Sequence, residues 1–448
     1  MCGCIGEFHL GTYATIHHFI SSSGHSTRKT TIHHSHSKYY ILALRRLPEE
    51  DAEAEEASVM EYMGPFSTGG TASFPGHVFF ISAEDDPLIP LIRFHVKGAP
   101  DNRFTYDPYH IEGDKKKTKQ NLKVLSKSDR KLYDKMRRTH LFNEEYKTFT
   151  GRSYLANFPR PRPMHHMWRA DYFGQTHWVV TKETHVTTMP PDDILKAIET
   201  TGTQRAIQVD SPRPLKEYQE EETMNMTMKV LSCAPRVFEI PNFLSQVEVD
   251  HILKIAGSED LALSGTGLGV SGEENAVADT RTSYNSWVER ERSPIIDAIY
   301  RRAADLMRID ESLLRKRGRG EHDELDTKNT LAELLQLVHY DPGQEYTAHH
   351  DFGFNNAADK HQNQRFATLL LYLNDDMTGG TTSFPRWLNA ETFEELHTKP
   401  EVGKAVLFYS QLPDGNMDDL SHHQANKVRI GEKWLINLWV WDPVYEYS

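Results

Sequence analysis

Two short motifs in this chain have the residue types and spacing of a metal site. They are His339-Tyr340-Asp341 and His349-His350-Asp351, among 24 histidines in total. Residues i and i+2 of a strand point to the same side, so the imidazole and the carboxylate of either motif can reach one ion. A non-haem Fe(II) oxygenase needs two imidazoles and one carboxylate on one face of the iron, with the opposite face open. The third ligand would come from a distant strand, and either motif alone also fits a purely structural role.

Only the second His-x-Asp motif stands within a longer ordered series of motifs. The series consists of residues 340–346 (YDPGQEY), 365–368 (RFAT), 372–375 (YLND), 379–385 (GGTTSFP), 403–408 (GKAVLF), His423, and 431–434 (GEKW). Together these motifs closely resemble the prolyl 4-hydroxylase family of 2-oxoglutarate oxygenases. The resemblance covers roughly residues 233–443.

The resemblance implies roles for four residues of the reaction centre. His349, Asp351 and His423 match the iron ligands, and Lys433 matches the cation that pairs with the distal carboxylate of 2-oxoglutarate. The neighbouring His422 is the alternative to His423, and the ten-residue spacing to Lys433 favours His423. A cation in a partly dry pocket forms a strong charge-assisted hydrogen bond with a carboxylate.

Five further residues match positions that contact the substrates in this family. Tyr340 and Thr382 match residues that hydrogen-bond the 2-oxoglutarate carboxylate. Tyr346, Arg365 and Trp439 match residues that line the peptide groove. Each of the five also fits ordinary packing in a core or on a strand.

The implied activity is peptidyl-proline 4-hydroxylation with Fe(II), O2 and 2-oxoglutarate, which releases succinate and CO2. L-Ascorbate is expected as an accessory reductant. One alternative is an oxygenase of the same chemistry that acts on another residue or on a small molecule. A second alternative is a peptide- or hydroxyproline-binding module whose catalytic half is vestigial, and the intact ligand pattern argues against it.

The amino-acid composition limits which binding partners and which cellular compartments are expected for this chain. The formal net charge is −13 over 448 residues, so no general basic surface for nucleic acid is expected. The basic run at residues 115–119 (KKKTK) is predicted to be a solvated loop. No window is apolar enough to span a membrane, and no secretory signal is recognisable. The three cysteines fit a reducing compartment such as the cytoplasm slightly better, whereas the family resemblance suggests the endoplasmic reticulum, so the compartment stays open.

The order of elements predicts an α+β chain in three parts. Residues 1–110 read as short strands separated by turns, which indicates a small β-sandwich. Residues 111–225 are charged and proline-containing and are interpreted as a linker with one or two helices. Residues 226–448 begin with helices, one opened by a capping box at Ser245–Glu248 and one by Pro294, and continue with many strands. That order favours a double-stranded β-helix, or jelly roll, packed by helices.

The N-terminal strands carry a second resemblance. Residues 66–80 (FSTGGTASFPGHVFF) and 91–96 (LIRFHV) are similar to the β-domain of the von Hippel-Lindau protein, within about residues 13–109. In that protein the domain recognises hydroxyproline. The resemblance would therefore combine a hydroxyproline-binding domain and a prolyl hydroxylase in one chain. An unrelated β-sandwich is the alternative.

Overall fold

The structure is a computed structural model of the whole chain. It describes residues 12–18, 42–47, 56–63, 66, 68–73, 76–83, 88–96, 101–156, 159–196, 214–258, 261–264, 281–325, 328–352, 364–389 and 394–443. The described residues divide into two compact units. Those up to Pro159 form the N-terminal unit, and those from Arg160 onward form the C-terminal unit.

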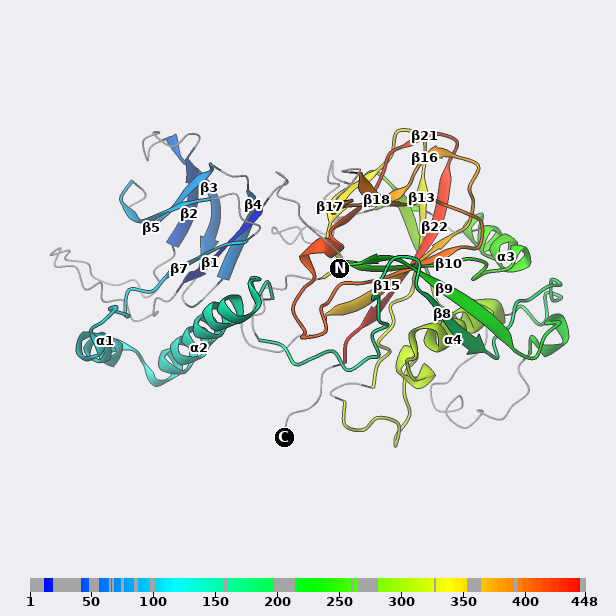
Figure 1. Cartoon of the computed structure of the whole chain (residues 1–448), viewed down its shortest axis with the longest axis horizontal. Coiled ribbons are helices and arrows are strands. Elements are labelled where there is room, and N and C mark those ends of the chain that lie inside the picture. The colour runs from blue at the N-terminus through cyan, green and yellow to red at the C-terminus, as the bar shows by residue number, and fades with distance from the viewer. Residues whose placement is uncertain are drawn as a thin grey trace. The chain divides into compact units, whose positions relative to one another are not determined.

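The N-terminal unit contains two β-sheets. One has the strand order β4-β1-β7 and the other β3-β2-β5-β6 (Figure 1). The strands are β1 (Thr12–His18), β2 (Leu42–Leu47), β3 (Ser58–Met63), β4 (Thr68–Ser73), β5 (Val78–Ala83), β6 (Pro90–His95) and β7 (Asp101–Tyr106). Phe79 and Ile81 of β5 pack with Leu44 and Phe94 in a buried cluster, while Phe80 belongs to a separate one. Two sheets around such clusters agree with the predicted small β-sandwich, and the resemblance to the von Hippel-Lindau β-domain stays a prediction.

Two helices follow the sheets of the N-terminal unit. They are α1 (Lys115–Asn121) and α2 (Lys127–Thr150). The Ser126 side chain caps α2 by accepting a hydrogen bond from the Asp129 amide, and Gly151 ends it with φ +70°. The prediction of a loop at residues 115–119 is therefore wrong. The run forms α1 because Asp114 caps the amides of Lys116 and Lys117.

The C-terminal unit is built on a nine-stranded sheet of order β11-β12-β13-β22-β15-β19-β10-β9-β8 and a four-stranded sheet of order β14-β20-β17-β18, with a small pair β16-β21. Its strands are β8 (Thr176–Thr181), β9 (Met224–Cys233), β10 (Arg236–Ile240), β11 (Ala262–Leu263), β12 (Tyr284–Val288), β13 (Leu335–Tyr340), β14 (Tyr346–His349), β15 (Arg365–Tyr372), β16 (Thr378–Gly379), β17 (Thr382–Leu388), β18 (Glu395–Thr398), β19 (Ala405–Tyr409), β20 (His423–Ala425), β21 (Val428–Ile430) and β22 (Lys433–Trp441).

Along the central strands of the large sheet, successive side chains point to two buried faces in turn, except at a bulge between Arg365 and Ala367. Val338, Leu370, Phe408 and Leu435 point to one face and share a cluster with Phe384 of the four-stranded sheet. All pairings in both sheets are antiparallel. Two antiparallel sheets that enclose a common interior are the predicted double-stranded β-helix.

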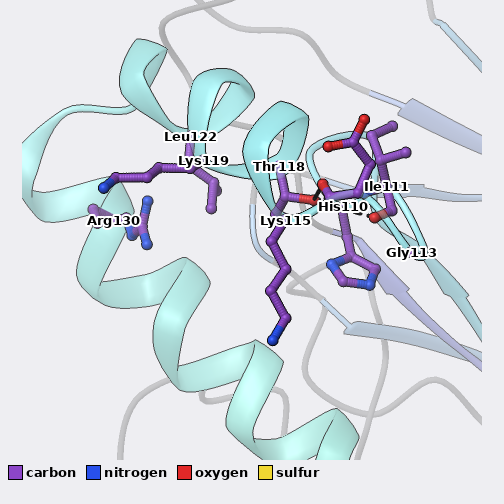
Figure 2. A pocket seen from close by; sticks show the side chains of 9 residues that line it. His110, Ile111, Gly113, Lys115, Thr118, Lys119, Leu122 and Arg130 are labelled. Carbon is purple, nitrogen blue, oxygen red and sulfur yellow. Dashed lines mark hydrogen bonds between the residues drawn. The ribbon is translucent and has the colours of Figure 1, made fainter.

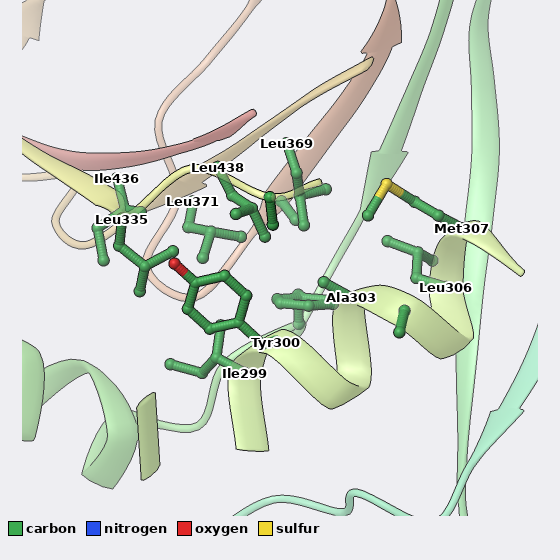
Figure 3. Close-up of a cluster of buried hydrophobic side chains, with 14 of the residues drawn as sticks. Ile299, Tyr300, Ala303, Leu306, Met307, Leu335, Leu369, Leu371, Ile436 and Leu438 are labelled. Carbon is green, nitrogen blue, oxygen red and sulfur yellow. The ribbon is translucent and has the colours of Figure 1, made fainter. Parts of the chain in front are cut away.

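The opposite face of the large sheet is covered by helix α4 (Pro294–Met307). Figure 3 shows Tyr300 of this helix directed toward side chains such as Leu335 and Leu371 of the sheet, and all three belong to one buried cluster. Because both faces of the central strands are buried, their sequences read as continuous apolar runs rather than as alternating ones. Helix α4 therefore packs against one face of the large sheet, and the four-stranded sheet packs against the other face.

Both predicted helix starts of the C-terminal unit are present. Helix α3 (Gln246–Ala256) begins with a full capping box between Ser245 and Glu248. The Glu248 carboxylate also forms a buried pair with Arg302 of α4, at 2.7 Å from Nη2. The cap residue therefore ties α3 to α4 as well.

One strand of the large sheet comes from the segment interpreted as a linker. β8 pairs with β9 along its whole length, so residues 176–181 extend the nine-stranded sheet at its edge. The sequence analysis did not predict this strand. Beyond that, the predicted division into three parts at residues 110 and 225 stays a prediction.

Candidate metal centre and co-substrate pocket

The side chains of His349, Asp351 and His423 converge in the interior of the C-terminal unit. His349 ends β14 and lies directly opposite His423 on β20, while Asp351 follows two residues after His349. The His349 Nε2 atom is 3.8 Å from Asp351 Oδ1, and His423 Nε2 is 3.7 Å from Asp351 Oδ2. Two atoms that each bind one ion at about 2.1 Å cannot be more than about 4.2 Å apart, so both spacings can be bridged by a single ion.

Hydrogen bonds fix the tautomer of both histidines. His349 Nδ1 lies 2.8 Å from the Thr347 carbonyl oxygen, and His423 Nδ1 lies 2.9 Å from the Ser421 carbonyl oxygen. A carbonyl oxygen can only accept, so each Nδ1 carries the proton. Each Nε2 therefore keeps its lone pair, as a metal-binding histidine requires.

The carboxylate of Asp351 is held by two donors from neighbouring strands. Its Oδ2 accepts from the Thr368 hydroxyl at 2.6 Å and from the Trp439 indole N–H at 2.9 Å. Burial alone would raise the pKa of Asp351, but electrostatic interaction with His423, His349 and the Arg365 guanidinium, together with the hydrogen bond from Thr368, outweighs burial and lowers it. The carboxylate is thus ionised, and its orientation is set before any ion binds.

Together these groups fit Fe(II). Two neutral imidazoles and one carboxylate are the donor set of non-haem Fe(II) oxygenases. His349 is partly exposed, whereas Asp351 and His423 are buried, so the cluster is reached from one side.

Lys433 is the most unusual residue of the barrel interior. Its side chain is fully buried, and its Nζ has no hydrogen-bond partner among the residues that the structure describes. The ammonium lies 5.4 Å from the ring centre of Tyr340 and 5.6 Å from that of Tyr372. Burial lowers the pKa of Lys433 to about 7. Because an isolated buried cation is costly, this position fits the carboxylate of a ligand.

Tyr340 lies beside this lysine, and Thr382 is hydrogen-bonded to Tyr372, the other ring near the ammonium. Tyr340 is the strand partner of Lys433 across β13 and β22. The Tyr372 hydroxyl donates to the Thr382 hydroxyl at 2.9 Å and is 2.8 Å from the Thr398 hydroxyl. The surroundings of Lys433 therefore contain neutral hydroxyl groups linked by hydrogen bonds.

The three residues expected to line a peptide groove fall into two groups. Tyr346 stacks on the ring of His349, with ring centres 3.7 Å apart. The Arg365 guanidinium lies 3.8 Å from the ring centre of Trp439 and donates two hydrogen bonds to Glu333, at 2.6 and 2.9 Å. Trp439 is only 6% exposed. Its ring packs against the Arg365 guanidinium, and its indole N–H donates to Asp351.

The first His-x-Asp motif forms a different cluster. His339 and Asp341 meet Glu432, with His339 Nε2 2.6 Å from a Glu432 oxygen. His339 stacks on Trp434, and both residues point away from the interior because Tyr340 and Lys433 beside them point inward. This cluster contains one imidazole and two exposed carboxylates, unlike the donor set at Asp351.

Sequence comparisons point in the same direction as this geometry. The model of the 2OG-Fe(II) oxygenase superfamily matches residues 335–441. The chain is 32% identical over 224 residues to a probable prolyl 4-hydroxylase 3 of Arabidopsis thaliana, and the match spans 47% of this chain and 71% of that protein. The chain belongs to the prolyl 4-hydroxylase family. It is therefore a 2-oxoglutarate-dependent dioxygenase that uses Fe(II).

Two other matches have similar extents. Prolyl 4-hydroxylase 1 of Arabidopsis thaliana is 33% identical over 224 residues, which span 48% of this chain and 72% of that protein. A viral collagen prolyl hydroxylase of Paramecium Bursaria Chlorella virus-1, solved with 2OG, is 24% identical and covers 46% of this chain and 95% of its own, with a TM-score of 0.33.

Two residues of this prolyl 4-hydroxylase family site were not predicted in their roles. Thr368 and Tyr372 lie inside recognised motifs, but no side-chain role was assigned to either. Their common signal is an inward position on β15, where Leu370 between them also points inward.

None of the described helices has the length and apolar character needed to cross a membrane.

Proposed function

We propose that this member of the prolyl 4-hydroxylase family is a peptidyl-proline 4-hydroxylase that binds Fe(II) through His349, Asp351 and His423. The observation that carries the proposal is the buried Lys433, whose Nζ has no hydrogen-bond partner among the described residues and which lies on the strand that also supplies Trp439. A 2-oxo diacid has one end that can chelate a metal and a second carboxylate some carbons away. The metal cluster and Lys433 provide one suitable group for each end.

The residues of this chain position the reactants. Bound Fe(II) would supply the oxidation chemistry, in which O2 and 2-oxoglutarate yield succinate, CO2 and a hydroxylated proline. Lys433, Tyr340 and Thr382 would hold the distal carboxylate. Thr368 and Trp439 would keep Asp351 oriented. L-Ascorbate is expected to support turnover as a reductant.

A peptide substrate is favoured by the aromatic residues near the metal cluster. Tyr346, Arg365 and Trp439 are proposed to line the groove, and Trp287 extends this set because it is 45% exposed with its ring centre 6.1 Å from that of Trp439. Extended proline-rich segments lose little entropy on binding and are typically recognised by aromatic-lined grooves. A small-molecule substrate would have no need for an exposed tryptophan beside the site.

The proposal is tested by product analysis. The full chain is incubated with Fe(II), 2-oxoglutarate, ascorbate and a proline-rich peptide, and mass spectrometry locates any added oxygen on proline C4. Oxygen on another residue, or succinate formation without any peptide product, would favour the alternative oxygenase. Metal binding without succinate formation under any of these conditions would favour a vestigial catalytic half.

A substitution distinguishes peptide binding from the chemistry itself. Trp287→Ala should lower peptide hydroxylation more than it lowers peptide-free decarboxylation of 2-oxoglutarate, because within the described residues Trp287 is neither one of the three candidate ligands nor a donor to Asp351. Trp178→Ala is the matched control, since Trp178 is 69% exposed on β8 at the far edge of the same sheet. Equal losses in both activities for Trp287→Ala would contradict a role in the peptide groove.

A further inference from the structure

The helical part of the N-terminal unit has a charge opposite to that of the whole chain. Residues 115–138 contain eleven lysines or arginines and only two acidic residues, Asp129 and Asp134, in a chain with a formal net charge of −13. Most of these basic side chains on α1 and α2 are exposed. This concentration of positive charge plays no part in the oxygenase chemistry proposed above.

A cavity of about 290 Å³ opens within this basic segment, and we call it the α1 pocket. Figure 2 shows the side chains around it, which come from the turn before α1, from α1 and its C-cap residue Leu122, and from the first turn of α2. The lining residues are His110, Ile111, Gly113, Asp114, Lys115, Thr118, Lys119, Leu122 and Arg130. The α1 pocket thus combines two aliphatic side chains with two lysines and an arginine.

The lining carboxylate, Asp114, is bound within α1 itself, and its Oδ2 lies 3.8 Å from the Nζ of Lys117, which does not line the cavity. Asp114 Oδ1 accepts hydrogen bonds from the amides of Lys116 and Lys117, at 3.1 and 2.9 Å. No ion pair of Lys115 or Lys119 is found within the described part of the chain. Both ammonium groups are therefore available to a ligand.

The other three polar side chains of the α1 pocket are already hydrogen-bonded within the chain, and the Thr118 hydroxyl donates to the Asp114 carbonyl oxygen at 2.9 Å. His110 Nε2 lies 3.1 Å from Arg137 Nη2, and because a guanidinium can only donate, this nitrogen accepts and Nδ1 is the donor. Arg130 is shared with Asp134, at 3.1 Å from Nε. The charged and donor groups at this site therefore favour an anion, while Ile111 and Leu122 favour an aliphatic portion next to the anionic group.

We propose that the α1 pocket binds an acidic peptide segment of a partner protein, with a glutamate or aspartate side chain in the cavity. Glutamate presents a carboxylate on an aliphatic stem, which matches cationic groups around an apolar floor. Single-stranded nucleic acid is the competing polyanion, but its binding sites combine basic groups with aromatic side chains on which bases stack. The nine lining residues include no Phe, Tyr or Trp.

Fluorescence polarisation with the full chain tests the proposal. The probe is a short fluorescein-labelled peptide of alternating glutamate and leucine, and the same peptide with glutamine in place of glutamate is the neutral control. The double substitution Lys115→Glu with Lys119→Glu reverses two lining charges. Lys123→Glu with Lys127→Glu is the matched control, because these exposed lysines carry the same charge but do not line the cavity.

The acidic peptide should bind, and the glutamine peptide should not. The lining double variant should weaken binding about tenfold or more, and the matched variant should weaken it only about two- to threefold, as expected when exposed charges act at a distance. Equal losses in both variants would overturn a defined pocket and leave only a diffuse basic surface. Tighter binding of a labelled oligouridylate with the same number of charges, or no peptide binding at all, would overturn the assignment of an acidic peptide.

Discussion

The two ends of the candidate active site differ in how their charges are balanced. At the metal end, the buried carboxylate of Asp351 accepts two hydrogen bonds and lies beside two imidazoles. At the co-substrate end, the buried ammonium of Lys433 has aromatic rings and hydroxyl groups nearby but no hydrogen bond within the described residues. The metal end thus has outer donors that orient its carboxylate, whereas the co-substrate end presents a cation that the carboxylate of a ligand can pair with.

This difference follows from what each end has to bind. A metal ion needs its ligands within a few tenths of an ångström of their final positions, so outer donors that orient the ligands are required in advance. A carboxylate is bound mainly by charge, and a cation already paired with a protein acid would have to give up that partner first. An unpaired buried lysine therefore lowers the stability of the free protein and raises its affinity for the co-substrate.

The largest effect is expected at the metal end. His423→Ala removes a ligand of the ion, so Fe(II) binding and succinate formation should both fall by more than the roughly 10- to 100-fold of an outer-residue change. His339→Ala is the matched control, because His339 belongs to the outward-facing cluster with Glu432. If His339→Ala were the variant that lost the metal, the ligand assignment would be wrong.

At the co-substrate end, Lys433→Ala should raise the 2-oxoglutarate requirement steeply. Removing one partner of a buried charge pair costs about 2–5 kcal/mol, or roughly 30- to 4000-fold in affinity. Lys404→Ala is a suitable comparison, since Lys404 is also buried but is already paired with Glu401 at 2.8 Å. Titration of 2-oxoglutarate by calorimetry should show a large change for the first variant and little for the second. An unchanged requirement in Lys433→Ala would remove this lysine from the pocket.

A smaller effect is expected from the outer donors of Asp351. Thr368→Val keeps the shape of the side chain but removes the hydroxyl hydrogen bond, and Fe(II) affinity should fall about 10- to 100-fold. Thr181→Val removes an equally short buried bond, from Thr181 to Asp305 at 2.6 Å, away from the metal cluster. That control should lose stability without losing metal affinity. Similar metal affinities in the two variants would show that Asp351 needs no outer support.

Much of this site could be predicted from sequence because its ligands occur in motifs with fixed spacing. His349 and Asp351 are two residues apart on one strand end, and Lys433 follows His423 by ten residues. The capping box at Ser245 and the proline at the start of α4 located the helices for the same reason, since these signals are local.

What could not be predicted depends on contacts between distant strands. Thr368 and Trp439 reach Asp351 because they are partners across β15 and β22, and no local pattern fixes that register. β8 was missed because its six residues lie in a charged, proline-containing segment and are stabilised by pairing with β9. The missing partner of Lys433 is likewise a property of the folded interior, and only the resemblance to a family suggested it.

The mildest perturbation is a change of pH, which acts on Lys433 without altering the chain. Burial lowers the pKa of this lysine from 10.5 to about 7, so the free enzyme holds its proton below about pH 7 and loses it above. The carboxylates of 2-oxoglutarate are ionised throughout this range and require the protonated lysine. Above pH 7, binding must therefore take up a proton, and the dissociation constant of 2-oxoglutarate should rise about tenfold per pH unit.

The stability of the free protein should change in the opposite sense. Between about pH 7 and 10.5 the unfolded chain holds a proton on Lys433 that the folded chain does not, so this group makes the free energy of unfolding increase as pH rises.

The proton taken up on binding can be measured directly. Calorimetry at pH 8 in buffers of different ionisation enthalpy should detect uptake of close to one proton per 2-oxoglutarate bound. Lys433→Arg serves as the control, because a guanidinium stays charged and its variant should show no uptake. Uptake of the same size in Lys433→Arg would assign the proton to another group and would remove the contrast between the two ends of the site.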